Sequence, residues 1–125
     1  MDLEGFTASL AAPSPPQGLG RPLEALWHAA RGAKDAKSAK SAKSAKNAKN
    51  AKNAKDGWDR AHRLVQADDS EAGAWVHAYL HRVEGDAGNA AYWYRRARRP
   101  VAEAPTAEEW REIAAALLAA RGGAG

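Results

Sequence analysis

The sequence contains no cysteine, which excludes disulfide bonds and metal sites built on thiolates. It has no apolar run of the length that a membrane span requires. No Lys or Arg precedes Arg21, so residues 1–20 lack the basic start of a secretory signal. We therefore expect a cytoplasmic protein that does not associate with a membrane.

Lysine is absent from most of the chain, and outside residues 33–56 arginine supplies every positive side chain. Residues 33–56 consist of eight consecutive Ala-Lys-X units, in which X is Asp, Ser or Asn; we call this segment the lysine tract. The tract holds eight Lys and two Asp, which give it a net charge of about +6. The remainder holds eleven Arg and thirteen acidic residues, a net charge of about −2, and the two parts together give the net charge of +4. The basic character therefore comes from the tract.

The lysine tract cannot form an apolar face in any helix. Three residues turn a helix by about 300°, so successive lysines are displaced by about 60° and surround the helix axis. We expect a marginal helix or a solvated coil that is dispensable for folding. Two interpretations stay open: a neutral tandem expansion, or an arm that binds polyanions by releasing counterions. The arm would consist of Lys34, Lys37, Lys40, Lys43, Lys46, Lys49, Lys52 and Lys55.

The remaining chain is short for a hydrophobic core. Residues 1–20 are rich in Pro and Gly and predict a flexible leader, and residues 122–125 predict a flexible tail. The domain then spans residues 21–121, and roughly 75 residues without the tract are left to build its core. Five tryptophans, one in each helix expected below, supply large buried areas.

Apolar residues recur at helical spacing in five stretches, and none alternates with period two. The sequence therefore predicts an all-α protein. Asp68 to Ser70 offer N-caps for the third helix, and Gly85-Asp86 ends that helix and caps the next. Thr106 and Glu109 have the spacing of a capping box before the fifth. The stretches start near Pro22, Trp58, Ser70, Asp86 and Thr106 and stop near Gly32, Val65, Gly85, Pro100 and Gly122.

An internal repeat becomes visible when the tract is removed. Gly32 and Gly85 are 53 residues apart, and subtracting the 24 residues of the tract leaves 29; Ala61 and Ala90 are also 29 apart. In this alignment Ala25 matches Ala78. A fixed period predicts stacked helix hairpins, here two, with the tract in the turn of the first. The fifth helix is expected to cover the open end of the second hairpin.

Gly85-Asp86 and the segment Asn89 to Ala97 resemble the second helix of a tetratricopeptide or Sel1-like repeat of the small bacterial type. Those repeats place Gly-Asp at the turn, a small residue that Ala90 matches, and an aromatic-basic-basic-Ala ending that Tyr94 to Ala97 match. The resemblance implies a short solenoid of two hairpins plus a capping helix. It also implies a non-enzymatic protein–protein interaction module with a protein or peptide partner.

His77 and His81 are one helical turn apart and Glu84 follows one turn later, a spacing that can hold a metal. The sequence identifies no further imidazole, since His62 is isolated, and no partners that would orient the rings. We therefore expect no metal and no cofactor. Instead, His77 and His81 are predicted to line a partner-binding face together with His28, the position aligned with His81.

A second candidate surface has helical spacing and carries Tyr92, Arg95, Arg96 and Arg99. It could bind carboxylates or phosphates, or its arginines could merely complement the helix dipole. No nucleophile–base pair, phosphate-cradling loop or carboxylate pair is present, so we expect no catalytic residues and no enzyme activity. The sequence predicts a protein-binding module, monomeric or weakly self-associating, with weak nucleic-acid binding through the tract as the alternative.

Overall fold

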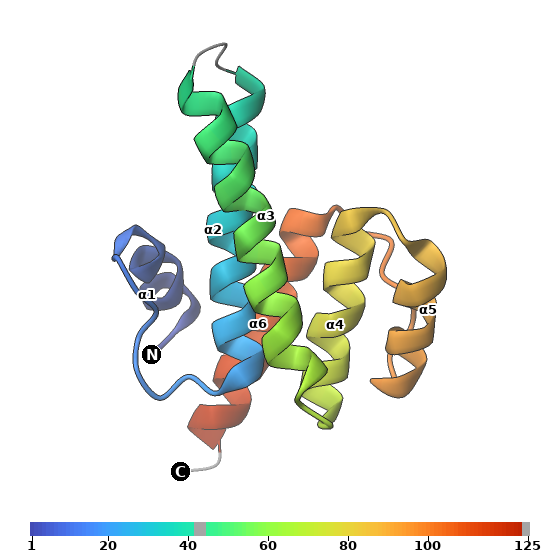
Figure 1. Cartoon of the computed structure of the whole chain (residues 1–125). Helices are drawn as coiled ribbons and strands as arrows, with labels where there is room; N and C mark the ends of the chain where they lie inside the picture. The colour runs from blue at the N-terminus through green and yellow to red at the C-terminus, as the bar shows by residue number, and fades with distance from the viewer. Residues whose placement is uncertain (42–44, 124–125) are drawn as a thin grey trace.

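The computed structural model describes the backbone of residues 1–41 and 45–123 and the side chains of residues 1–32 and 56–120. All regular structure in these ranges is helical, which confirms the all-α prediction (Figure 1). None of the described helices combines the length and the apolar character that crossing a membrane requires. The elements are α1 Leu3–Ala8, the 3-10 turn η1 Ser9–Ala11, α2 Arg21–Ser41, α3 Ala45–Gln66, α4 Glu71–Glu84, α5 Ala87–Arg96 and α6 Thr106–Gly123.

The helices pack as hairpin-like pairs. α2 lies along α3, α4 lies along α5, and α3 joins the two pairs by packing on α4. The paired α2 and α3 project well beyond the other helices (Figure 1). α6 contacts α1, α2 and α4, so it lies across both pairs and does not only cover the end of the second.

The positions paired by the predicted internal repeat agree in burial only at the alanines. Ala25 and Ala78 are both fully buried, and Ala61 and Ala90 are buried as well. Gly32, in contrast, is buried within α2, whereas the aligned Gly85 is exposed at the end of α4. The repeat therefore stays a prediction.

The predicted caps around α4 and α5 are confirmed. The Ser70 side chain accepts a hydrogen bond from the Gly73 amide at the start of α4. Gly85 ends α4 in the left-handed conformation at φ 90°, which a residue without Cβ adopts readily. Asp86 then accepts from the Asn89 amide and starts α5.

Gly32 and Gly57 do not interrupt the helices, contrary to the sequence-based prediction. α2 continues through Gly32 to Ser41, and α3 starts at Ala45 and passes through Gly57. A Cβ at Gly57 would lie 2.7 Å from the His28 carbonyl oxygen and 3.0 Å from the Gly32 Cα. The glycines therefore permit close contact between α2 and α3, and the lysine tract extends the two helices beyond that contact (Figure 1).

Residues 1–20, which we expected to be a flexible leader, pack on the domain. Asp2 caps α1, and Phe6 is fully buried and stacks on Trp110 with ring centroids 5.5 Å apart. The Trp27 indole donates to the carbonyl and hydroxyl oxygens of Ser9. The predicted tail overlaps the end of α6 at Gly123, and residues 124–125 lie outside the described part.

The predicted capping box at α6 does not form. Thr106 is already the first helical residue, and the Glu108 and Glu109 amides donate to the Pro105 carbonyl. The Glu109 carboxylate is buried and accepts hydrogen bonds from Arg82, at 2.8 Å, and from the Tyr94 hydroxyl. Burial and the bond to Glu109 raise the pKa of Tyr94. This buried network connects α4, α5 and α6.

We predict that deleting residues 33–56 leaves a folded domain with a similar or higher melting temperature. Gly32 and Gly57 lie against one another, so the ends to be joined are already adjacent, and a shorter connection lowers the entropy cost of closing the hairpin. Thermal unfolding followed by circular dichroism measures the effect. A second deletion variant with Gly-Asn-Gly at the joint distinguishes local strain from loss of the tract; a molten or aggregated state in both contradicts the prediction.

We predict that Gly57→Ala destabilises the domain by about 1–3 kcal/mol, because the overpacking against three backbone atoms outweighs the helix propensity of Ala. Gly88→Ala is the matched control. A Cβ at Gly88 meets only Asp86 Oδ1, at 3.8 Å, so this helical substitution should be neutral or stabilise by up to about 1 kcal/mol. Urea unfolding compares the two variants, and equal changes would argue against a tight contact between α2 and α3.

Candidate functional site

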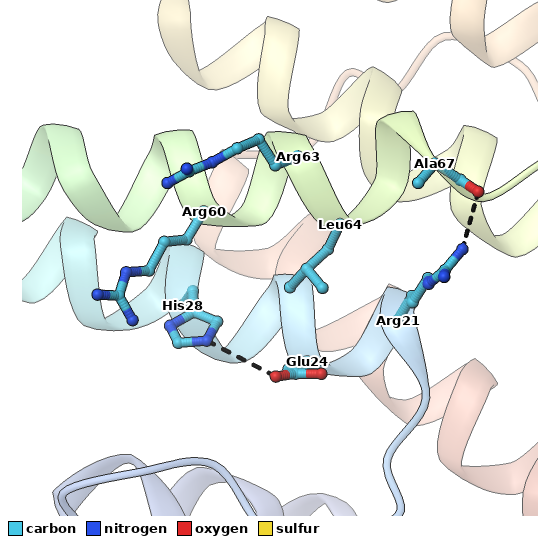
Figure 2. Close-up of a pocket in the computed structure, with 7 residues that line it drawn as sticks. All are labelled: Arg21, Glu24, His28, Arg60, Arg63, Leu64 and Ala67. Carbon is cyan, nitrogen blue, oxygen red and sulfur yellow. Dashed lines mark hydrogen bonds and ion pairs between the residues drawn. The ribbon is translucent and has the colours of Figure 1, made fainter.

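A surface groove of about 510 Å³ lies between α2 and α3, and we call it the basic groove (Figure 2). Helix α2 contributes one arginine, a glutamate and a histidine, while α3 contributes two arginines and an apolar side chain. Its lining residues are Arg21, Glu24, His28, Arg60, Arg63, Leu64 and Ala67. Three arginines and one carboxylate give the groove a positive charge.

The arginines of the basic groove have few internal partners. Arg21 donates to the Ala67 carbonyl at 2.9 Å, which fixes its position across the end of the hairpin. Arg63 donates to the Asp59 carbonyl at 3.4 Å. Among the described residues, no carboxylate lies within ion-pair distance of Arg60. The groove thus offers guanidinium groups whose charge is not balanced locally.

His28 lies in the same groove and points toward Glu24 (Figure 2). Its Nε2 is 4.0 Å from the Glu24 carboxylate. Burial lowers the pKa of His28. The nearby charges of Arg60 and Arg31 lower this pKa further, whereas the Glu24 carboxylate raises it. A smaller hollow of about 290 Å³ shares His28 and Arg60 with the groove and adds Arg31 and the carboxylate of Asp56, next to the start of the lysine tract.

Three imidazoles converge where α3 packs on α4, and we call His62, His77 and His81 the histidine cluster. The Nε2 atoms of His62 and His77 are 3.0 Å apart. One ring nitrogen from each of the three histidines lies within 4.8 Å of the others. His77 and His81 are buried, whereas His62 is half-buried and gives the cluster access to the surface.

Two tryptophans enclose the histidine cluster. Trp93 of α5 stacks on His77 with centroids 3.8 Å apart, and Trp58 stacks on His62 at 4.9 Å. The Trp58 indole N–H donates to the Leu80 carbonyl at 2.8 Å, which holds this part of α3 against α4. The aromatic rings therefore cover His62 and His77 on one side each.

The surroundings of the cluster lower the pKa of two of its histidines, His62 and His77. Burial lowers the pKa of His77 to about 4, and the nearby His62 and His81 contribute to the decrease. Burial and His81 also lower the pKa of His62, with Glu84 and Asp59 acting in the opposite direction. Glu84 Oε1 lies 2.6 Å from His81 Nδ1. His77 Nδ1 is buried and has no hydrogen-bond partner.

The structure changes the predicted roles of the histidines. His77 and His81 are enclosed between α3, α4 and α5 and do not line an exposed partner-binding face. His28 is separate from them, in the basic groove. His62 is not isolated. The repeated spacing of four in Trp58–His62 and His77–His81 was the only sequence signal for the cluster, and it gives no information on the register between α3 and α4.

The predicted surface of Tyr92, Arg95, Arg96 and Arg99 is split. α5 ends at Arg96, and Arg98 has a left-handed conformation at φ 60°, so Arg99 does not continue the helical spacing. The Arg99 guanidinium instead lies 3.5 Å from the centre of the Trp75 ring. Arg96 donates to the exposed Tyr92 hydroxyl at 3.1 Å, and Arg95 is exposed beside this pair.

The eight tract lysines lie outside the described side chains, and Lys43 lies outside the described backbone as well. No protein-family model, curated protein or solved structure matches the chain. The resemblance to tetratricopeptide and Sel1-like repeats therefore stays a prediction.

We predict that the metal-free protein loses stability as the pH falls from 6.5 toward 4. The folded pKa of His77 lies below its ordinary value of 6.5, so the unfolded state binds more protons in this range and stability decreases with falling pH. The contribution of this side chain is at most about 3 kcal/mol. Urea unfolding with a chelator present measures it. In His77→Phe, which keeps a ring against Trp93, the decrease should be smaller; parallel pH profiles would contradict the prediction.

Proposed function

We propose that this chain is a cytoplasmic, non-enzymatic interaction module that binds an acidic protein segment in the basic groove. In this proposal α2–α3 and α4–α5 are two units of a short tetratricopeptide- or Sel1-like solenoid, and α6 closes it. The resemblance at Gly85 to Ala97 and the shared burial of Ala25 and Ala78 support the repeat.

The observation that carries the proposal is the unbalanced charge of the basic groove. Arg21, Arg60 and Arg63 face a groove with a single carboxylate, and that carboxylate lies beside His28. Guanidinium groups bind carboxylates through paired, charge-assisted hydrogen bonds. An acidic side chain from a partner would therefore find donors that the described protein leaves without ion pairs.

The shape of the groove fits a peptide segment. Its volume of about 510 Å³ lies within the range of ligand-binding clefts, and Leu64 provides an apolar contact between the charged side chains. Arg21 is held by the Ala67 carbonyl, so part of the site is ordered before binding. A short segment with alternating acidic and apolar residues satisfies both features.

Polyanion binding is the second candidate, supported by where the charge lies. The α2–α3 segment, residues 21–66, contains twelve Lys and Arg and four acids, about +8, and the rest of the chain therefore carries about −4. This charge is concentrated on the projecting pair of helices (Figure 1). A nucleic acid would contact that surface through its phosphates, with steep salt dependence and little sequence preference.

Two labelled probes test the proposal by fluorescence anisotropy: a terminally blocked peptide of alternating Glu and Leu, and a mixed-sequence single-stranded oligonucleotide. We expect the double variant Arg60→Ala/Arg63→Ala to weaken peptide binding by about 10–100-fold, the loss typical of charged hydrogen bonds. Arg111→Ala, an exposed arginine on α6, is the charge control, and Tyr92→Ala tests the Tyr92–Arg96 surface.

Deletion of the lysine tract separates the two candidates. Peptide binding that persists in the deletion variant and is lost in Arg60→Ala/Arg63→Ala supports the groove. Oligonucleotide binding that disappears with the tract and falls steeply with salt, together with no peptide binding, supports the polyanion arm. Peptide binding that is equal in wild type and the double variant contradicts the proposed function.

A further inference from the structure

The histidine cluster is a group of three potential metal ligands among the described side chains, and it shares no residue with the basic groove. We propose that His62, His77 and His81 bind a divalent transition-metal ion such as Zn²⁺, with Glu84 orienting His81. This inference is independent of the proposed peptide binding. It also reverses the expectation from the sequence, which offered neither a third imidazole nor an orienting carboxylate.

The distances suit three imidazole ligands. Zn–N bonds of about 2.0–2.1 Å in a tetrahedral site place ligand nitrogens about 3.3 Å apart. The Nε2 atoms of His62 and His77, at 3.0 Å, differ from this separation by a few tenths of an ångström. The ring nitrogen of His81 lies within 4.8 Å of the other two, so it approaches them by at most about 1.5 Å when an ion binds.

Glu84 supplies the orienting interaction that metal-bound histidines require. An ionised carboxylate only accepts hydrogen bonds, so the 2.6 Å contact places a hydrogen on His81 Nδ1. The His81 Nε2 lone pair is then available for a metal, the arrangement found in carboxylate–histidine–zinc sites. Asp86, also close to His81, already accepts two hydrogen bonds from Asn89.

The facing ring nitrogens of the cluster can serve either a hydrogen bond or a metal ion. The Nε2 atoms of His62 and His77 lie 3.0 Å apart, a contact that one shared hydrogen satisfies in the metal-free protein. A cation between the rings would instead accept both Nε2 lone pairs, with the hydrogen of each neutral ring on Nδ1. The buried His77 Nδ1 has no hydrogen-bond partner and gains none from the ion. His62 is half-buried, so the cluster can be reached from solvent.

Isothermal titration of the untagged, chelator-treated protein with ZnCl₂ tests the site. We expect saturable binding of one ion per chain, and a melting temperature that rises with zinc concentration by mass action. His62→Gln should weaken binding at least about tenfold, and Glu84→Gln by about 10–100-fold. His28→Gln is the matched control, because it removes an imidazole outside the cluster, and it should leave binding unchanged.

Cobalt gives a readout that a structural role alone would not produce. Bound Co²⁺ should show visible absorption typical of nitrogen coordination in the wild type, and lose it in His62→Gln. Circular dichroism establishes that each variant is folded. His62→Gln is the decisive variant, because His62 is half-buried and its replacement disturbs the core least. No saturable zinc binding to the wild type, or equal affinities in wild type and a folded His62→Gln, would overturn the proposal.

Discussion

Hydrogen bonds from buried and half-buried tryptophans to neighbouring backbone determine how the helices of this small domain meet. An indole buries a large area, but its N–H must find an acceptor when water is removed. Three indoles donate to an oxygen on a different element, so each fixes one contact between elements as well as filling the core. The bonds are Trp27 to Ser9, Trp58 to Leu80 and Trp110 to Leu26.

Helix α3 connects the two candidate sites because its opposite sides meet different neighbours. Arg60 and Arg63 line the groove with α2, whereas Trp58 and His62 face α4. The indole bond to α4 that completes the core therefore also determines the position of His62. A change in the contact between α3 and α4 would alter the histidine cluster first, and it would leave the pairing of α2 with α3 in place.

Local signals predicted the helices well, while contacts between distant segments were not predictable. Helical spacing and the Gly85-Asp86 cap depend on neighbouring residues, and both agree with the structure. Phe6 lies in a segment too short to show periodicity, and its burial depends on Trp110, far away in sequence. Glycine usually marks the end of a helix, and only the close approach of α2 explains why Gly57 lies inside α3. The histidine cluster was missed for the same reason: the register between α3 and α4 is a tertiary property.

The contact between Gly32 and Gly57 separates a constant part of the protein from a part that can vary in length. On one side of this contact lie the buried residues of the core. On the other side, α2 and α3 continue into the lysine tract, which is built from three-residue units. One unit added to each helix lengthens the projection by about 4.5 Å, since each residue rises 1.5 Å. Replication slippage that inserts or removes whole units keeps the coding frame. The distance over which this domain presents positive charge can therefore evolve in small steps while selection preserves the fold beneath.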